Sequence, residues 1–271
     1  MSAFFRKNIF ILGIVLVFSL LTGSYVIFAQ RFTEERRVPL QFDFVSQWNG
    51  GVVSGTTATD VGEGNDGTLL GGTSVVSGRF GKAFKFNGSS SYIKMGNPAS
   101  LNFGPGPFSL NAWFMWDGGG SSVNNIIRKS NYPRKGPGAG YWLRIGTGQG
   151  RAVLEFSAGA TTDFEGQSFI SAPISPGVWH SVVATRDSSG DVKLYIDGES
   201  KGTVIRQVPN AETTSEAPFT IGAWDDRFGV REFFSGLIEE VSVYNRALDS
   251  SEIEFAYQEM RQILAAKDSG V

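Results

Sequence analysis

The chain contains no cysteine and only one histidine among its 271 residues. Without cysteine it cannot form a disulfide bond, use a thiol nucleophile, bind zinc through thiolates or carry a lipid on an N-terminal cysteine. The histidine, His180, lies in the apolar segment VWHSVVATRD, and the sequence has no nucleophile elbow for a Ser–His–Asp hydrolase. Stability must therefore come from a hydrophobic core, helped by a metal ion only where oxygen atoms can bind one.

An excess of positive charge is also lacking, because the formal net charge is −2. Arg6 and Lys7 are the only charged residues in 1–29, so the rest of the chain holds 22 of the 24 basic residues and all 26 acidic ones, a net charge of −4. Proteins that bind nucleic acid through its phosphates carry clustered basic residues. We therefore expect no nucleic-acid partner.

One long apolar segment without charge runs from Ile9 to Phe28. It is long enough to cross a bilayer as a membrane anchor, and the basic pair before it favours a cytoplasmic N-terminus. It also fits a signal peptide cleaved after Ala29, and a buried helix of a soluble domain is a third alternative. The first two alternatives place the following chain outside the cytoplasm. We predict a signal peptide or transmembrane anchor at 1–29 and a charged connector at 30–40.

The remaining sequence has the features of a β protein, with 35 glycines and 22 phenylalanines in the whole chain. The run FSLNAWFMW predicts a strand covered on both faces, and Asp197-Gly198 between two alternating runs predicts a β-hairpin. A C-terminal helix is predicted to begin with Ser250 or Ser251 as its cap. Many short strands without alternating helices predict a sandwich of two antiparallel sheets. The tryptophans predicted to lie in its core are Trp113, Trp116, Trp142 and Trp179.

Seven motifs follow one another along this part of the chain. They are GTTATDVGEGNDGTL, GRFGKAFKFNGSSSYIKM, LNFGPGPFSLNAWF, IIRKS, GVWHSVVATRD, VKLYIDGESKGT and FSGLIEEVSVYNRALDSSEI. Their order resembles that of laminin-G-like, concanavalin-A-like jelly-roll modules of secreted proteins. We predict a C-terminal helix and tail at 256–271 from the residues themselves, and the resemblance implies an all-β jelly roll of two antiparallel sheets at 41–255. It also implies a non-catalytic binding or adhesion role and a structural calcium ion near the chain termini of the fold.

Glu239 is the acidic residue that the β pattern does not explain. Strand alternation places it on one face with Leu237, Val241 and Val243, and a buried carboxylate without a partner is unfavourable. A calcium ion would remove the conflict, since it takes about six to eight oxygen ligands. The glycine-rich segment TDVGEGNDG offers further oxygens. The predicted calcium ligands are Asp60, Asn65, Asp66, Glu239 and Glu240.

Part of this ligand set rests on the resemblance. In the laminin-G-like modules that this chain resembles, an aspartate usually occupies the position of Glu239, and a loop aspartate matches Asp60. The longer side chain of Glu239 changes the geometry of such a site. The alternative is that Glu239 bonds to Arg79, Lys82 or backbone amides, or that a β-bulge turns it outward.

Two loops carry side chains suited to ligand binding. Aromatic rings can stack on sugars while charged groups bond hydroxyls, and loops on a rigid scaffold often carry function. The predicted ligand-binding residues are Tyr132 and Arg134 (with Lys135) in the first loop, and Trp224, Asp225, Asp226 and Arg227 (with Arg231) in the second. The alternative is a pair of ordinary solvated loops, with Trp224 packed against the sandwich.

Motifs for catalysis are weak. Sandwich glycosidases need two carboxylates about 5–9 Å apart, and adjacent Glu239 and Glu240 point to opposite faces of a strand. The match of Gly62–Gly67 to G-x-G-x-x-G is not followed by a helix, as dinucleotide binding requires. The sequence therefore predicts a non-catalytic module that recognises carbohydrate or another cell-envelope component. A structural protein–protein module is the alternative, a glycan-active enzyme comes third, and an uncleaved N-terminal segment would add a membrane partner.

Overall fold

The computed structural model describes the sandwich and its C-terminal helix. The described residues are 44–62, 64–131, 140–148, 151–159, 169–205 and 212–268. They all belong to the second of two compact units, residues 38–271. The predictions for 1–29 and 30–40, and for Tyr132, Arg134 and Lys135, lie outside the described residues. Within these ranges, no helix combines the length and apolar character needed to cross a bilayer.

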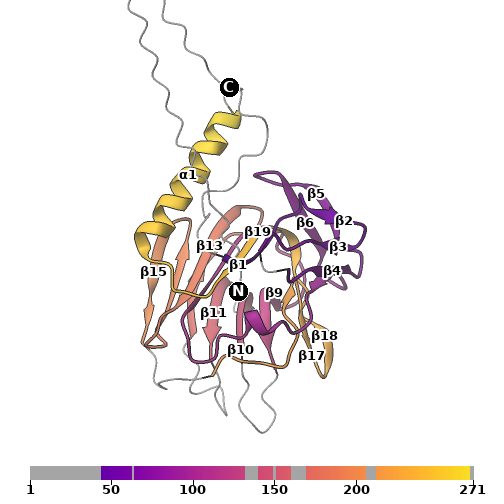
Figure 1. The fold of residues 1–271 in the computed structure, drawn as a ribbon. Coiled ribbons are helices and arrows are strands. Elements are labelled where there is room, and N and C mark those ends of the chain that lie inside the picture. The colour runs from indigo at the N-terminus through magenta and orange to yellow at the C-terminus, as the bar shows by residue number, and fades with distance from the viewer. Residues whose placement is uncertain are drawn as a thin grey trace, which may run out of the picture. The chain divides into compact units, whose positions relative to one another are not determined.

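The first sheet has eight strands (Figure 1). Its order is β15 (Glu199–Val204), β14 (Val192–Ile196), β13 (Trp179–Arg186), β8 (Phe108–Trp116), β19 (Ser235–Tyr244), β6 (Lys82–Asn87) and β5 (Ser74–Ser77), with β1 (Phe44–Trp48) paired to β19. Neighbouring strands are antiparallel. The C-terminal strand β19 therefore lies in the middle of the sheet, between β8 and β6.

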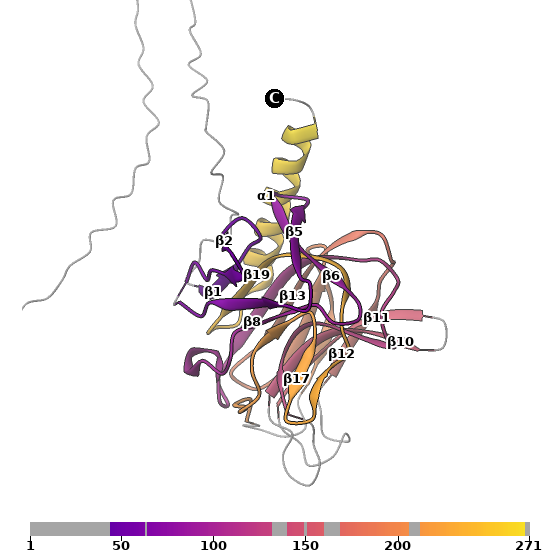
Figure 2. The same ribbon diagram turned by 90° about the vertical axis from the view of Figure 1, so that its right-hand side faces the viewer.

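The second sheet has nine strands and faces the first (Figure 2). Its order is β12 (Phe169–Pro173), β11 (Arg151–Ala158), β10 (Gly140–Gly148), β9 (Val123–Ser130), β16 (Thr220–Ile221), β7 (Tyr92–Lys94), β4 (Gly67–Leu70), β3 (Thr57–Ala58) and β2 (Val53–Ser54). A separate hairpin follows β16, formed by β17 (Trp224–Asp226) and β18 (Gly229–Arg231), and a short 3-10 helix spans Ala99–Leu101. The two antiparallel sheets confirm the predicted sandwich.

Strand β8 shows why its sequence is apolar throughout. Leu110, Ala112 and Phe114 point into the core between the sheets and have no exposed surface. On the opposite face the ring of Trp113 stacks on Tyr257, with ring centroids 5.9 Å apart. Both faces are covered, as the sequence predicts. Three of the four tryptophans predicted for the core are buried, and Trp179 is half-buried.

Helix α1 (Ser250–Asp268) covers the outer face of the first sheet (Figure 1). Ile253, Ala256 and Met260 are buried, at the spacing of one helical face. The N-cap is Asp249, whose Oδ1 accepts a hydrogen bond from the N–H of Glu252 at 2.8 Å. The Glu252 side chain in turn accepts one from the N–H of Asp249 at 2.9 Å, which completes a capping box. The predicted serine cap is therefore wrong by one or two residues, because an aspartate stands directly before it.

The predicted hairpin at Asp197-Gly198 is confirmed. Both residues have positive φ, 55° and 79°, as a tight two-residue turn requires. The Asp197 carboxylate also accepts a hydrogen bond from the N–H of Ser181 at 2.9 Å and lies 2.8 Å from Nδ1 of His180. The single histidine thus fixes this turn.

Candidate functional site

Strand β19 contains a β-bulge at the predicted calcium ligands. Its pairing with β8 shifts between Glu239 and Ser242, and Glu240 has a φ of 53°. Beyond the bulge, Val241 and Val243 point into the core. The prediction that Glu239 shares their face is wrong, because the extra residue interrupts the alternation and leaves Glu239 on the outer face.

Glu239 is fully buried there, and backbone amides bind it. Its Oε1 accepts from the N–H of Arg79 at 3.0 Å and of Phe80 at 3.3 Å, and its Oε2 accepts from the N–H of Arg79 at 3.1 Å. Burial raises the pKa of Glu239 to about 7, although these amides and the charges of Arg79 and Lys267 lower it. The structure thus shows the alternative arrangement, in which protein donors stabilise the carboxylate.

Glu240 is buried beside it, with 8% of its surface exposed. Within the described ranges, its Oε2 has no hydrogen-bond partner. Burial, followed by the charge of Glu239, raises the pKa of Glu240 to about 7. The two neighbouring glutamates therefore share one poorly solvated region.

The other three predicted calcium ligands hold the glycine-rich loop together. Asp60 Oδ1 accepts from the N–H of Gln47 at 2.8 Å and of Gly62 at 2.9 Å, and its Oδ2 accepts from the N–H of Asn65 at 2.9 Å. Asp66 Oδ1 accepts from the N–H of Asp60 at 2.8 Å. These carboxylates cap backbone amides, as aspartates do in tight loops.

The arrangement does not fit a calcium site. No three acidic or histidine side chains in the part of the chain that the structure describes are grouped closely enough to hold a metal ion. The Asp60 and Glu239 oxygens face N–H groups, whose positive ends repel a cation. The contacts of these residues give a calcium ion no support, and calcium binding rests on the sequence prediction alone.

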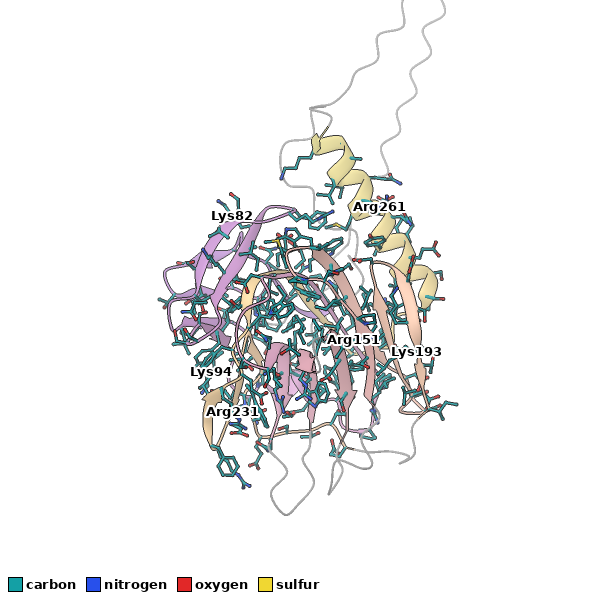
Figure 3. The ribbon with its side chains drawn as sticks, turned by 180° about the vertical axis from the view of Figure 1, so that it is seen from behind. Lys82, Lys94, Arg151, Lys193, Arg231 and Arg261 are labelled. Carbon is teal, nitrogen blue, oxygen red and sulfur yellow. The ribbon has the colours of Figure 1, made fainter. Side chains whose placement is uncertain are left out.

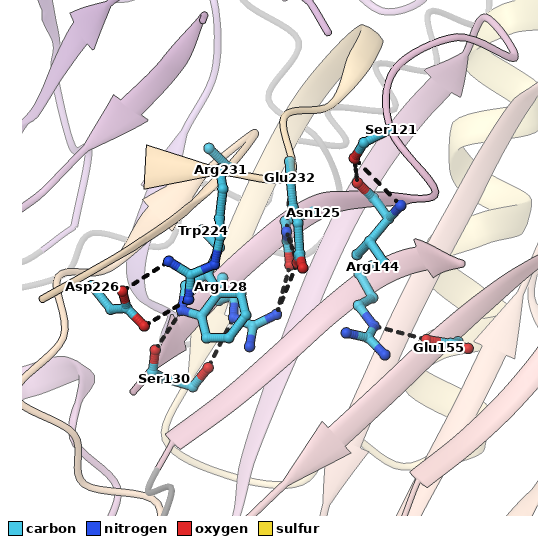
Figure 4. A network of polar contacts seen from close by, with 12 residues as sticks. Ser121, Asn125, Arg128, Ser130, Arg144, Glu155, Trp224, Asp226, Arg231 and Glu232 are labelled. Atoms are coloured by element: carbon cyan, nitrogen blue, oxygen red, sulfur yellow. Dashed lines mark hydrogen bonds and ion pairs between the residues drawn. The ribbon is translucent and has the colours of Figure 1, made fainter. Parts of the chain in front are cut away.

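Trp224, predicted to be an exposed stacking residue, is 5% exposed. Its ring lies between two guanidinium groups, with the Cζ atoms of Arg128 and Arg231 at 3.4 and 3.6 Å from the ring centroid (Figure 4). Its Nε1 donates to the backbone oxygen of Ser130 at 2.9 Å. The structure shows the alternative here, a tryptophan packed against the sandwich.

The acidic residues next to Trp224 fix the β17–β18 hairpin. Asp225 forms an ion pair with Lys94 at 2.8 Å, and Asp226 accepts two hydrogen bonds from Arg231 at 2.9 and 2.8 Å. Arg227 stays exposed at the hairpin tip, where its Cζ lies 4.8 Å from the ring centroid of Phe228. Of the four predicted residues in this loop, only Arg227 is accessible for a ligand.

The outer face of the second sheet carries two side chains that the sequence analysis did not single out, Arg144 and Glu155 (Figure 4). On β10, the Cζ of Arg144 lies 4.1 Å from the ring centroid of Trp142. Its Nε donates to Oε2 of Glu155 on β11 at 2.8 Å. We use the name arginine–tryptophan face for these residues together with the neighbouring Trp224 and the two arginines that cover its ring. The face comprises Arg128, Trp142, Arg144, Glu155, Trp224 and Arg231.

Arg144 is the accessible centre of this face. Its side chain is 25% exposed and that of Glu155 is 16% exposed. Among the described residues, the Arg144 side chain forms a hydrogen bond only through its Nε atom. Both of its Nη atoms can therefore donate hydrogen bonds to a ligand. Arg128 is buried instead, and it donates to Ser130 at 2.9 Å and Asn125 at 3.1 Å. Burial lowers the pKa of Arg128 well below its ordinary value.

The pattern that reveals this face is present in the sequence. In YWLRIG, Tyr141, Leu143 and Ile145 alternate with Trp142 and Arg144, so the second set must share the face opposite the core. Trp142 is buried, as predicted, although it lies outside the hydrophobic cluster between the sheets. The six basic residues labelled in Figure 3 come from both sheets, the β17–β18 hairpin and helix α1.

Comparisons with known proteins agree with this architecture. The family model described as the concanavalin A-like lectin/glucanases superfamily matches residues 87–254. No curated protein sequence matches the chain.

Solved structures similar to the chain include a domain of an extracellular enzyme and binding domains of toxins. Domain 4 of an extracellular arabinanase from Geobacillus stearothermophilus, in complex with arabinotriose, superimposes with a TM-score of 0.58 at 20% identity, over 80% of this chain and 98% of that domain. The binding domain of Paraclostridial Mosquitocidal Protein 1 gives 0.59 at 17% identity, over 80% and 52%. The botulinum neurotoxin serotype D ligand-binding domain with N-acetylneuraminic acid gives 0.59 at 16%, over 80% and 51%. The chain thus spans about half the length of the two toxin domains, and the likeness shows a shared fold.

Proposed function

Because the chain belongs to the concanavalin A-like lectin/glucanases superfamily, we propose that it is an extracytoplasmic, non-catalytic module that binds carbohydrate at the arginine–tryptophan face. A shared fold does not fix a function, so the proposal depends on the site. The observation that carries it is the position of Arg144, stacked on Trp142 and bonded to Glu155 with its Nη atoms unused among the described residues.

The chemistry of this centre suits sugar hydroxyls. A hydroxyl group both accepts and donates hydrogen bonds. The Nη atoms of Arg144 can donate to it, while Oε1 of Glu155, which has no bond within the described ranges, can accept from its neighbour. The ring of Trp142 and the Nε bond already fix the guanidinium, so little side-chain entropy is lost on binding.

The charge balance of the face favours a neutral sugar. Arg144 pairs with Glu155 at 2.8 Å and Arg231 with Asp226 at 2.8 Å. Arg128 lies 3.7 Å from Glu232. Each guanidinium group therefore has its own carboxylate, which leaves no excess charge to select an anion.

The same pairing supports a binding role over glycoside hydrolysis. A glycosidase needs two carboxylates that face one glycosidic bond, one of them able to give up a proton. Here the carboxylate of Glu155 bonds to Arg144, and that of Asp226 accepts two hydrogen bonds from Arg231. Such groups hold arginines in position.

An extracytoplasmic location is part of the proposal. Its support is the uncharged segment Ile9–Phe28 after a basic pair, together with the absence of any thiol that oxidation outside the cytoplasm would attack. Among the similar structures, the domain of an extracellular arabinanase and the toxin binding domains agree with it.

A protein-binding role is the second candidate, and the β17–β18 hairpin supports it. Phe228 at its tip is 52% exposed, beside the exposed Arg227. Exposed aromatic residues and arginines are enriched where proteins bind one another. One similar structure is a botulinum neurotoxin binding domain in complex with rat synaptotagmin II.

A glycan array followed by calorimetry tests the proposal. We expect a neutral glycan to bind the full chain, and Arg144→Ala to weaken that binding at least about tenfold, because charge-assisted hydrogen bonds are lost. Arg144→Lys should recover little, since lysine lacks the planar fork. The control is Arg261→Ala, an exposed arginine on helix α1.

Two results would contradict the carbohydrate proposal. One is an array without binding, and the other is full glycan affinity in a folded Arg144→Ala protein. A protein partner whose binding is lost in Phe228→Ala and kept in Arg144→Ala would support the second candidate.

A further inference from the structure

A cavity of about 610 Å³ opens where the ends of the two sheets meet. Trp116, the last residue of β8, forms its wall on the first sheet, and β10, β11 and β12 approach it from the second sheet. Ala152 and Ile174 in its lining also pack against the hydrophobic core. Ligand pockets in proteins commonly enclose about 300–1,000 Å³, so the cavity has the size of a small-molecule site.

The walls of this cavity are rigid. Pro173 pairs with Val153 in the sheet, and Pro173 and Pro176 have a fixed backbone φ angle. The backbone oxygen of Trp116 accepts from the N–H of Gly177 at 2.7 Å. The Trp116 indole N–H donates to the backbone of Gly119 at 2.9 Å, which fixes the ring. The apolar surface is therefore formed before any ligand arrives.

Among the described residues that line the cavity, two are polar and neither is acidic. Thr147 donates its hydroxyl hydrogen to the backbone oxygen of Ser122 at 3.2 Å, so towards the cavity it can only accept. Arg151 is exposed, and within the described residues its guanidinium group has no hydrogen bond or ion pair. Arg151 is the first residue of β11, and its side chain is labelled in Figure 3. The cavity thus combines an apolar wall with one available positive charge.

We propose that this cavity binds an amphiphilic anion, with an apolar body against Trp116 and the two prolines and a carboxylate or phosphate bound by Arg151. A guanidinium group binds such oxyanions through two parallel hydrogen bonds. A sugar fits less well, because its hydroxyls would lie unpaired against apolar walls. This site is separate from the arginine–tryptophan face, so the test of anion binding does not depend on whether the chain binds carbohydrate.

Calorimetry with ten-carbon amphiphiles tests this site on the full chain. We expect decanoate and decyl phosphate to bind with one site per chain, and decyltrimethylammonium, which has the same tail and the opposite charge, to bind at least about tenfold more weakly. Arg151→Glu should weaken decanoate binding at least about tenfold, whereas Arg261→Glu on helix α1 makes the same charge change and should leave it unaltered. Ala152→Phe, which fills the apolar end, should weaken both anions and confirm the location.

Two results would overturn the proposal. One is the absence of saturable decanoate binding, and the other is unchanged decanoate affinity in a folded Arg151→Glu protein. Cosedimentation with phosphatidylglycerol vesicles distinguishes the source of the ligand. Vesicle binding lost in Arg151→Glu and kept in Arg261→Glu assigns a lipid headgroup, and decanoate binding without vesicle binding assigns a free amphiphile.

Discussion

The carboxylate of Glu239 accepts hydrogen bonds at 3.0 and 3.1 Å from the backbone N–H of Arg79, a residue 160 positions earlier in the chain. This contact joins the middle of β19 to the turn between β5 and β6, which closes with a hydrogen bond from the N–H of Gly78 to the oxygen of Gly81 at 3.0 Å. The turn also needs a residue without a side chain, because a Cβ on Gly78 would lie 2.0 Å from Oε2 of Glu239. The buried acid and the glycine thus depend on each other.

Gly78→Ala should therefore destabilise the fold. We expect a loss of about 2–3 kcal/mol in the free energy of unfolding, since an added methyl group must displace a fixed carboxylate. Urea denaturation measures it. Gly81→Ala is the matched control, because a Cβ there would meet no atom within 4 Å. Equal stability of the two variants would show that Glu239 is not held as described.

Glu239 and Glu240 predict an unusual dependence of stability on pH. Burial raises the pKa of each glutamate to about 7 from an ordinary value of 4.5. The folded state then binds more protons than the unfolded state between these values, so their stabilising effect is complete below pH 4.5 and is lost as the pH rises through 7. We expect a higher melting temperature at pH 5 than at pH 8.

Glu240→Gln tests the cause of this dependence. Glutamine has similar size and no charge, so the variant should lose much of the difference between pH 5 and pH 8 and gain stability at pH 8. Calorimetric melting curves at both pH values measure this. A wild-type protein that melts at a higher temperature at pH 8 than at pH 5 would contradict the assignment.

Removal of divalent cations tests the calcium prediction. Because Asp60 and Glu239 accept their hydrogen bonds from backbone N–H groups, we expect EDTA to leave the melting temperature unchanged. A decrease in EDTA that calcium reverses, and that is absent in Glu239→Gln, would instead establish the metal site. Magnesium serves as the control cation, since it needs a smaller and more regular shell of ligands.

Local sequence patterns predicted the parts of the fold that depend on neighbours along the chain. The Asp197-Gly198 turn and the doubly covered strand β8 were both correct, since turn chemistry and hydrophobic runs are local properties. The order of motifs then identified the two-sheet fold. The helix was also predicted, and only its cap was misplaced.

The site depended on relations that one strand cannot reveal. The bulge at Glu240 arises from pairing between β19 and β8, so alternation read along β19 alone assigned Glu239 to the wrong face. Whether Trp224 is exposed depends on Arg128, which lies in another strand far away in sequence. The shared outer face of Trp142 and Arg144 could have been predicted from the sequence, because these two residues alternate with core residues in a single strand.

The β17–β18 hairpin allows a test of whether the arginine–tryptophan face is rigid. Arg231 covers one face of Trp224 at 3.6 Å and donates twice to Asp226, whose side chain has no exposed surface. Arg231→Met should lower the free energy of unfolding by about 2–3 kcal/mol, because it removes two charge-assisted bonds from a buried carboxylate. Urea titration followed by tryptophan fluorescence measures this loss. Arg227→Met, in the exposed tip of the same hairpin, should change stability by less than about 0.5 kcal/mol.

Because Asp226→Asn removes the charge that Arg231 neutralises, the double variant should be more stable than the sum of the two single losses predicts. Strict additivity would mean that the pair does not hold the hairpin on the sheet.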